Sequence, residues 1–319
     1  LFTRKKSNHI ANDDYRIAPP YQAKPLKPND LEVASDFIDI ECLDRFTEQA
    51  IKWLDGQTSA SRNGKPFMLY LSYTSPHKPV IPLKRFRGKG GAGAYGDFMM
   101  ETDWHVGRVL DCIDKNKLTD NTVVVFTSDN GPESTWRRRI EEYNHHSNGI
   151  YREGKRSIYE GGHRVPFLIR WPNNVKASSK WDSPVCQTDF LATFADILGK
   201  KLPENAGEDS VSFYKALIGQ DAPQRFAMIH HSMRGRYAVR EGKWKLIMES
   251  GSKDSKRELY DLSVDPGELS NLIVKYPDVA ERLKKSITEI IQNGRTTSGR
   301  AQKNDTKFWS DLHWMSDPD

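Results

Sequence analysis

The sequence predicts an α/β protein with a doubly wound, mostly parallel sheet and a smaller antiparallel α+β subdomain at its C-terminal end. Up to about residue 200, short apolar runs alternate with longer segments of helical periodicity, which is typical of a parallel sheet covered by helices. After about residue 222, short alternating runs are joined by tight turns, as in an antiparallel sheet. We therefore expect an α/β domain over residues 1–221 and an α+β subdomain over 222–319.

The first elements follow from composition and periodicity. Residues 1–33 are polar and contain several prolines, which favours an irregular surface segment. Apolar residues at helical spacing predict helices over about 37–54 and 96–117. Between them, residues 66–73 have the pattern of a buried strand. The glycine-rich stretch 88–96 lacks the Gly-Lys-Ser/Thr ending of a phosphate loop, so we interpret it as a flexible linker.

The later elements of the first domain are two strands and a helix. Apolar runs predict strands over 122–128 and 165–171, separated by a long charged loop. A helix is expected from Gln187 to Leu198, because Gly199 stands where a helix C-cap glycine is usual.

The C-terminal subdomain is predicted from its turns. Residues 236–240 and 243–248 alternate on either side of Glu241-Gly242, which indicates a β-hairpin. Three further elements are expected, a strand over 258–262, a turn at Asp265-Pro266-Gly267 and a helix over about 277–292.

Composition restricts the class of protein. The chain of 319 residues is 37% hydrophobic and 29% charged, ordinary values for a globular enzyme, and no apolar stretch is long enough to span a bilayer. A net charge of +5 gives no general case for nucleic-acid binding but suits an anionic substrate. Three separated cysteines, Cys42, Cys112 and Cys186, give no disulfide framework, and nothing in the sequence specifies an oligomeric state.

The most informative motif is Asp129-Asn130-Gly131-Pro132, which directly follows the apolar run 122–127. A strand there would deliver two adjacent oxygen-bearing side chains to its C-terminal end, where open α/β sheets bind their ligands. Carboxylate and amide oxygens suit a hard cation such as Ca²⁺. The alternative is an ordinary Asn-Gly turn.

Two other segments change the balance between these interpretations. The predicted strand 66–73 is followed by Pro76-His77, and Gly154-Lys155 leads into a third strand through Tyr159-Glu160-Gly161-Gly162 and Arg164-Val165-Pro166. In this order the motifs resemble those of the sulfatase family, specifically arylsulfatase-type enzymes of the alkaline phosphatase superfamily. The resemblance runs from about residue 37 to the C-terminus.

The resemblance implies roles for four residues. Asp129 and Asn130 match two ligands of the family's single Ca²⁺ ion, and the remaining ligands are expected upstream of this chain. His77 and Lys155 match the residues that contact the sulfate group. Taken alone, His77 reads as a polar loop residue and Lys155 as a solvated one, and Arg156 is interpreted as a surface residue.

The nucleophile of the family is a formylglycine made from a Cys/Ser-x-Pro-x-Arg motif, and none of the three cysteines lies in such a motif. The chain begins at Leu1 without a signal-like segment, so we expect the C-terminal portion of a longer protein, with a sheet that is incomplete in its N-terminal part. The formylglycine is then expected upstream, and this portion alone is expected to be inactive.

The resemblance implies that the longer protein hydrolyses aryl or carbohydrate sulfate monoesters, in a periplasmic or extracellular location. Two alternatives stay open. One is a phosphatase, phosphodiesterase or phosphonate hydrolase of the same superfamily, and the other is a non-catalytic protein that binds sulfated glycans. The segment Trp136-Arg137-Arg138-Arg139 could bind a sulfated sugar above the site, or be a solvated charged loop.

Overall fold

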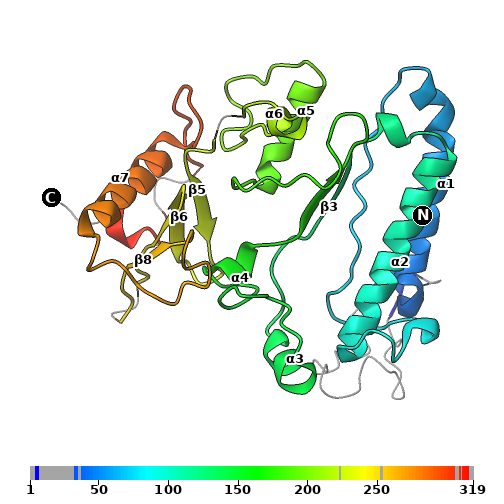
Figure 1. The fold of residues 1–319 in the computed structure, drawn as a ribbon, viewed down its shortest axis with the longest axis horizontal. Helices are drawn as coiled ribbons and strands as arrows, with labels where there is room; N and C mark the ends of the chain where they lie inside the picture. The colour runs from blue at the N-terminus through cyan, green and yellow to red at the C-terminus, as the bar shows by residue number, and fades with distance from the viewer. Residues whose placement is uncertain are drawn as a thin grey trace. The chain divides into compact units, whose positions relative to one another are not determined.

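The computed structural model describes the strands Arg4–Lys6 and Glu32–Ala34 and residues 37–222, 224–251, 254–305, 309 and 311–315. The chain divides into two compact units (Figure 1). The first unit comprises Leu1–Thr122 with Thr135–His146, and the second unit comprises Val123–Ser134 with Ser147–Asp319. This division does not test the domain boundary at residues 221 and 222, which stays a prediction.

Two long helices form the first unit. Helices α1 (Cys42–Arg62) and α2 (Gly93–Lys115) pack side by side, and Leu43 and Phe98 join Val80 and Ile81 in a buried cluster (Figure 1). Helix α1 begins later than predicted and continues to Arg62, past the predicted end near residue 54. Its buried face extends from Leu54 to Ser61, and a glycine inside a helix costs only about 1 kcal/mol, so packing overrides Gly56.

The predicted strand at 66–73 has no regular secondary structure and pairs with no other strand in the described ranges. Met68 is 72% exposed and Tyr70 is 78% exposed, so this segment is not buried as the sequence pattern predicted. Its end is anchored, because the hydroxyl groups of Tyr73 and Thr47 lie 2.7 Å apart. An apolar run specifies an extended backbone, whereas burial also requires neighbouring strands.

The glycine-rich stretch 88–96 is a structured turn, so the prediction of a flexible linker was wrong. The buried carboxylate of Asp97 accepts hydrogen bonds from the N–H groups of Gly88, Lys89 and Gly90, at 2.8–2.9 Å. A Cβ atom at Gly90 would lie 2.0 Å from the carbonyl carbon of Gly96. The glycines therefore allow backbone to pack directly against backbone.

The charged loop predicted after residue 128 contains a helix, α3 (Trp136–Tyr143), which belongs to the first unit. The side chain of Arg139 is buried, with its guanidinium 3.8 Å from the centre of the Tyr95 ring and 2.9 Å from the Thr135 hydroxyl. The described part of this unit also contains the short 3-10 helices η2 (Asp39–Glu41), η3 (Lys84–Phe86) and η4 (Thr119–Asn121). Strands β1 (Arg4–Lys6) and β2 (Glu32–Ala34) pair antiparallel at the ends of the predicted irregular segment, most of which lies outside the described residues.

The second unit begins with strands β3 (Val124–Thr127) and β4 (Phe167–Arg170), both close to their predicted positions. They pair antiparallel, with Val124 opposite Arg170, where we expected parallel strands. Parallel pairing needs a crossover, usually a helix packed on the sheet, and this unit has only the single turn α4 (Glu160–His163) between them. The predicted helix follows as η5 (Gln187–Asp189) and α5 (Phe190–Ile197), and the next helix is α6 (Tyr214–Leu217).

A four-stranded antiparallel sheet forms the C-terminal part, as predicted. Strands β5 (Met228–His231), β6 (Tyr237–Glu241), β7 (Trp244–Ile247) and β8 (Glu258–Asp261) lie in that order, and β5 is the one that the sequence did not predict. Helix α7 (Pro277–Asn293) covers one face (Figure 1), where its Leu283 and Ile287 are fully buried with side chains of the sheet. The short helix η6 (His313–Met315) adds Trp314 to this core. Within the described part of the chain, no helix has both the length and the hydrophobicity needed to cross a membrane.

Candidate active site

The two predicted metal ligands follow the end of strand β3. Asp129 is exposed and Asn130 is half-buried. The amide of Gln187 donates a 2.5 Å hydrogen bond to the carbonyl oxygen of Ser128, which fixes the end of the strand. Asn130 donates from Nδ2 to the carbonyl oxygen of Gly131 at 3.0 Å, and its side-chain oxygen is then the atom left to accept. The donor set therefore fits a hard cation, with one carboxylate and one amide oxygen from adjacent residues.

The loop 129–132 packs directly against the segment that carries Lys155. The N–H of Gly131 donates to the carbonyl oxygen of Gly162 at 3.0 Å, and the N–H of Lys155 donates to that of Pro132 at 2.8 Å. A Cβ atom at Gly131 would lie 1.8 Å from the carbonyl oxygen of Gly161, so only glycine fits there. The structure thus joins the backbones of two motifs that are separate in sequence, and the convergence of the Asp129, Asn130 and Lys155 side chains stays a prediction.

An ion pair beside these contacts joins the same two segments. The guanidinium of Arg156 lies 2.8 and 2.9 Å from the two carboxylate oxygens of Glu133. This hydrogen bonding lowers the pKa of Glu133 to about 2. Arg156 is exposed, as predicted for a surface residue, but its side chain connects the two motifs.

Behind Lys155, buried charges connect its segment to the C-terminal sheet. Glu160 is 2% exposed, and Lys245 and Glu268 are fully buried. The Lys245 ammonium lies 3.0 Å from Glu160 Oε1 and 2.8 Å from Glu268 Oε1. Burial would raise the pKa of Glu160, but the hydrogen bond with His163 and the charge of Lys245 outweigh it and hold that pKa well below its usual range. Burial dominates at Glu268, whose pKa is raised.

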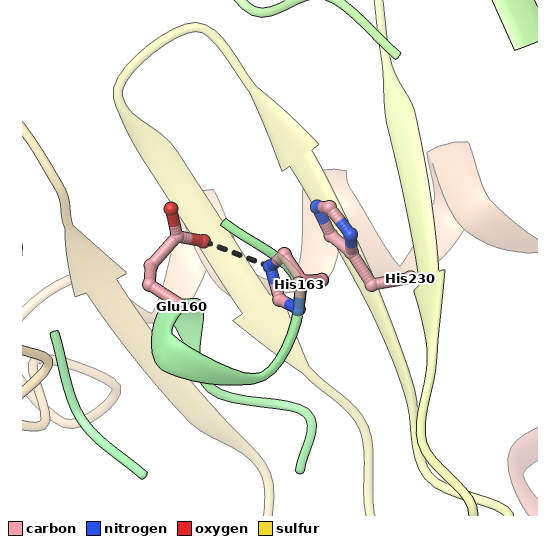
Figure 2. Close-up of side chains that lie close together, drawn as sticks. All are labelled: Glu160, His163 and His230. Carbon is pink, nitrogen blue, oxygen red and sulfur yellow. Dashed lines mark hydrogen bonds and ion pairs between the residues drawn. The ribbon is translucent and has the colours of Figure 1, made fainter. Parts of the chain in front are cut away.

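Glu160, His163 and His230 form a trio whose possible ligand atoms lie within 4.8 Å of one another (Figure 2). The imidazole rings are stacked, with centres 3.9 Å apart and planes 20° apart, so their in-plane lone pairs do not converge on one point. The carboxylate of Glu160 already faces three cations, with Arg164 and Arg240 at 3.3 and 3.6 Å in addition to Lys245. A divalent cation would add charge to a buried and already cationic cluster, so we interpret the trio as structural.

His77 lies in the first unit, so its convergence on the site around Lys155 stays a prediction. Its side chain is exposed, and Nδ1 lies 2.7 Å from the carbonyl oxygen of Lys78. A carbonyl can only accept, so Nδ1 carries the proton and Nε2 of the neutral ring is an acceptor. The segment is held by a hydrogen bond from the Thr102 hydroxyl to that of Ser75 at 2.7 Å.

The arginine-rich segment is organised differently from the predicted sugar-binding loop. Its residues begin helix α3 in the first unit, where Arg139 is buried and Arg138 pairs with Glu142. Arg139 is therefore a packing residue, and a position of this helix above the site stays a prediction.

Sequence reasoning missed Lys245, Glu268 and His230. Glu268 directly follows the predicted turn Asp265-Pro266-Gly267, in which the carboxylate of Asp265 accepts hydrogen bonds from the N–H groups of Leu269 and Ser270. The available signal was Lys245 itself, a charged residue between the apolar residues Trp244 and Leu246 of a predicted strand.

Comparison with known proteins identifies the family. The family model described as Sulfatase matches residues 8–200, and the model described as N-sulphoglucosamine sulphohydrolase, C-terminal, matches residues 149–293. The chain belongs to the sulfatase family, as its motifs indicated.

Similar proteins agree with this assignment. The chain is 36% identical over 247 residues to an N-acetylgalactosamine-6-O-sulfatase of Bacteroides thetaiotaomicron, covering 72% of this chain and 48% of that protein. It is 32% identical over 259 residues to human arylsulfatase A, covering 72% and 50%. A solved structure from work on glycosaminoglycan metabolism by Bacteroides thetaiotaomicron has a TM-score of 0.73 and 32% identity, and the match covers 81% of this chain and 56% of that one. The predicted α/β class is thus confirmed as a sulfatase fold, and the chain spans about half the length of the curated relatives it matches.

Proposed function

We propose that the whole protein is a sulfuric ester hydrolase that removes sulfate from a carbohydrate. The observation that carries the proposal is the pair of backbone hydrogen bonds that join the loop 129–132 to the segment 154–162. These contacts join the backbones of the two motifs, and they support our proposal that the Lys155 ammonium and the two oxygen ligands serve one site, which would suit a compact anion and a metal ion. The similarity to an N-acetylgalactosamine-6-O-sulfatase supports a sulfated sugar as the substrate.

The sulfatase family in general uses a metal ion and a formylglycine. For this protein we propose Ca²⁺, held in part by Asp129 and Asn130, because both offer hard oxygen atoms. Bound there, Ca²⁺ would supply charge that neutralises the sulfate oxygens. None of residues 1–319 lies in a Cys/Ser-x-Pro-x-Arg motif, so we place the nucleophile in a part of the protein outside this sequence.

Two side chains of this chain act on the sulfate group in the proposal. Lys155 binds and orients a sulfate oxygen, and among the described residues its ammonium is not paired with any carboxylate. His77 presents Nε2 as an acceptor, where it can hold a proton during the reaction.

The test is sulfate release by the whole protein, produced in a host that makes formylglycine and assayed with Ca²⁺. Substrates are 6-sulfated N-acetylgalactosamine, an aryl sulfate and the matching aryl phosphate. We expect turnover of a sulfate ester, with kcat/KM of Lys155→Ala lower by roughly 100- to 1000-fold, because a charge contact to the transferring group is lost. Lys180→Ala, an exposed lysine of the same unit, is the control.

The other outcomes separate the alternatives. Preferential turnover of the phosphate ester would favour a phosphatase or phosphodiesterase. Binding of sulfated sugars without turnover, in a protein shown to contain formylglycine, would favour the non-catalytic alternative. Unchanged kcat/KM in Lys155→Ala would return Lys155 to the solvated surface.

A further inference from the structure

The side chain of Lys245 extends from strand β7 to the segment that carries Lys155. All proposed metal ligands and sulfate-binding residues lie far from Lys245 in the sequence. Its ammonium donates to the carbonyl oxygen of Ile158 at 2.9 Å and to Glu160 Oε1 at 3.0 Å. The carboxylate of Glu268 lies 2.8 Å away, and its other oxygen accepts the N–H of Glu160 at 2.6 Å. One fully buried lysine and one fully buried glutamate thus hold residues 158–160 from behind.

The segment that they hold is closed on itself. The N–H of Gly161 donates to the carbonyl oxygen of Arg152 at 2.9 Å, and the N–H of Ser157 donates to the carbonyl oxygen of Gly154 at 3.1 Å. A Cβ atom at Gly161 would lie 2.3 Å from the carbonyl oxygen of Glu153, so backbone packs on backbone inside the loop. A displacement at Ile158 or Glu160 is therefore passed to Lys155, because the loop between them has little room to deform.

The two buried carboxylates depend on Lys245 unequally. Glu160 also faces Arg164 and Arg240, at 3.3 and 3.6 Å, and the imidazole of His163 at 3.2 Å. Among the residues that the structure describes, Lys245 is the one cation that forms an ion pair with Glu268. Without the lysine, Glu268 would be a buried carboxylate that faces the like charge of Glu160, and the more distant Arg240 would be left to offset its negative charge.

We propose that Lys245 and Glu268 are positioning residues for Lys155, through which the C-terminal sheet sets the place of the sulfate-binding ammonium. The proposal rests on the proposed function of Lys155. It assigns the C-terminal sheet a part in catalysis, although neither of the two residues touches the substrate.

The kinetic test uses the whole protein and compares Lys245→Met with Lys243→Met. We expect Lys245→Met to lower kcat/KM by about 100-fold, since a misplacement of about 1 Å at a reacting group has an effect of that size. Lys243 lies on the same hairpin, but its side chain is 52% exposed and pairs with Asp261 at the surface, so its variant should keep the wild-type value. Rates are expressed per folded molecule.

Charge compensation separates positioning from a loss of packing. In Lys245→Met the repulsion between Glu160 and Glu268 should be relieved when Glu268 is protonated or replaced. We expect the ratio of variant to wild-type kcat/KM to rise at least ten-fold between pH 7.5 and pH 5.0. We also expect Lys245→Met/Glu268→Gln to recover at least ten-fold over Lys245→Met at pH 7.5. A flat ratio, together with no recovery in the double variant, would overturn the proposal.

Amide hydrogen exchange gives a readout that needs no catalysis. Lys245→Met should lose protection in residues 152–162 while α7 and the Lys243 hairpin keep theirs, and unchanged exchange in 152–162 would overturn the proposal. If wild-type protein releases no sulfate, the proposed function fails and exchange alone decides the positioning. If Lys245→Met does not fold, Lys245→Arg carries the test, because it keeps the charge but not the compact ammonium. Wild-type kcat/KM and exchange in Lys245→Arg would then overturn the proposal.

Discussion

At the scale of single residues, the candidate site depends on contacts that fix the backbone from which its side chains extend. Gly131 shows this most clearly, since any Cβ there would collide with the carbonyl oxygen of Gly161 at 1.8 Å. The sequence Asn-Gly is explained both by a turn and by this close approach, which is why the motif alone left two interpretations. The contact with the segment 154–162 explains why position 131 must be a glycine.

The pair Glu133–Arg156 predicts a pH effect on stability. The pKa of Glu133 in the folded protein is about 2, below its ordinary value of about 4.5. A lowered pKa contributes stability that is fully present above about pH 4.5 and is lost as the pH falls towards 2. Both side chains are partly exposed, so we expect Glu133→Gln to lower the free energy of unfolding at pH 7 by at most about 1 kcal/mol.

The measurement is urea unfolding of wild type and Glu133→Gln at pH 7 and near pH 2.5. The difference between the two proteins should shrink at the lower pH. A difference that stays constant or grows would show that Glu133 contributes through something other than its charge. Glu204→Gln is a control, because the Glu204 side chain is exposed.

At the scale of elements, helix α2 is the support for the segment that carries His77. Thr102 on this helix bonds Ser75, and Glu101 accepts the N–H of Leu83 at 2.7 Å. The start of α2 is in turn held by Asp97, whose carboxylate accepts three N–H groups of the glycine-rich turn. The order of this turn could not be predicted from the sequence. Glycines indicate a flexible backbone, and they do not indicate that the Asp97 carboxylate would fix it.

Replacing Asp97 by alanine should destabilise the protein by about 3 kcal/mol, because three N–H groups lose a charged acceptor in a largely buried place. The control is Asp103→Ala, an exposed aspartate of the same helix, for which we expect a change within about 0.5 kcal/mol. Both free energies come from urea unfolding. A loss of less than about 1 kcal/mol for Asp97→Ala would mean that the turn is held by its backbone contacts alone.

At the scale of the whole molecule, the sequence predicted most helices and strands, because periodicity is local. Short motifs named the residues of the candidate site, and their roles stay predictions. It did not predict the antiparallel pairing of β3 with β4 or the exposure of residues 66–73, since both depend on which strands are neighbours. The buried group Lys245, Glu160 and Glu268 was missed for the same reason, because the fold brings Glu160 into contact with residues that lie 85 and 108 positions away in sequence. Family membership came from the motifs and was confirmed by the comparisons.

The central claim is that His77, Lys155, Asp129 and Asn130 belong to one sulfate site. The most direct measurement is an experimental structure of the whole protein with Ca²⁺ and sulfate. The account predicts a sulfate oxygen within about 3 Å of Lys155 Nζ and of His77 Nε2, which must then carry a proton to donate to it. It also predicts side-chain oxygens of Asp129 and Asn130 at about 2.3–2.6 Å from the ion. A sulfate bound elsewhere, or a structure in which His77 points away from the site of Lys155, would contradict it.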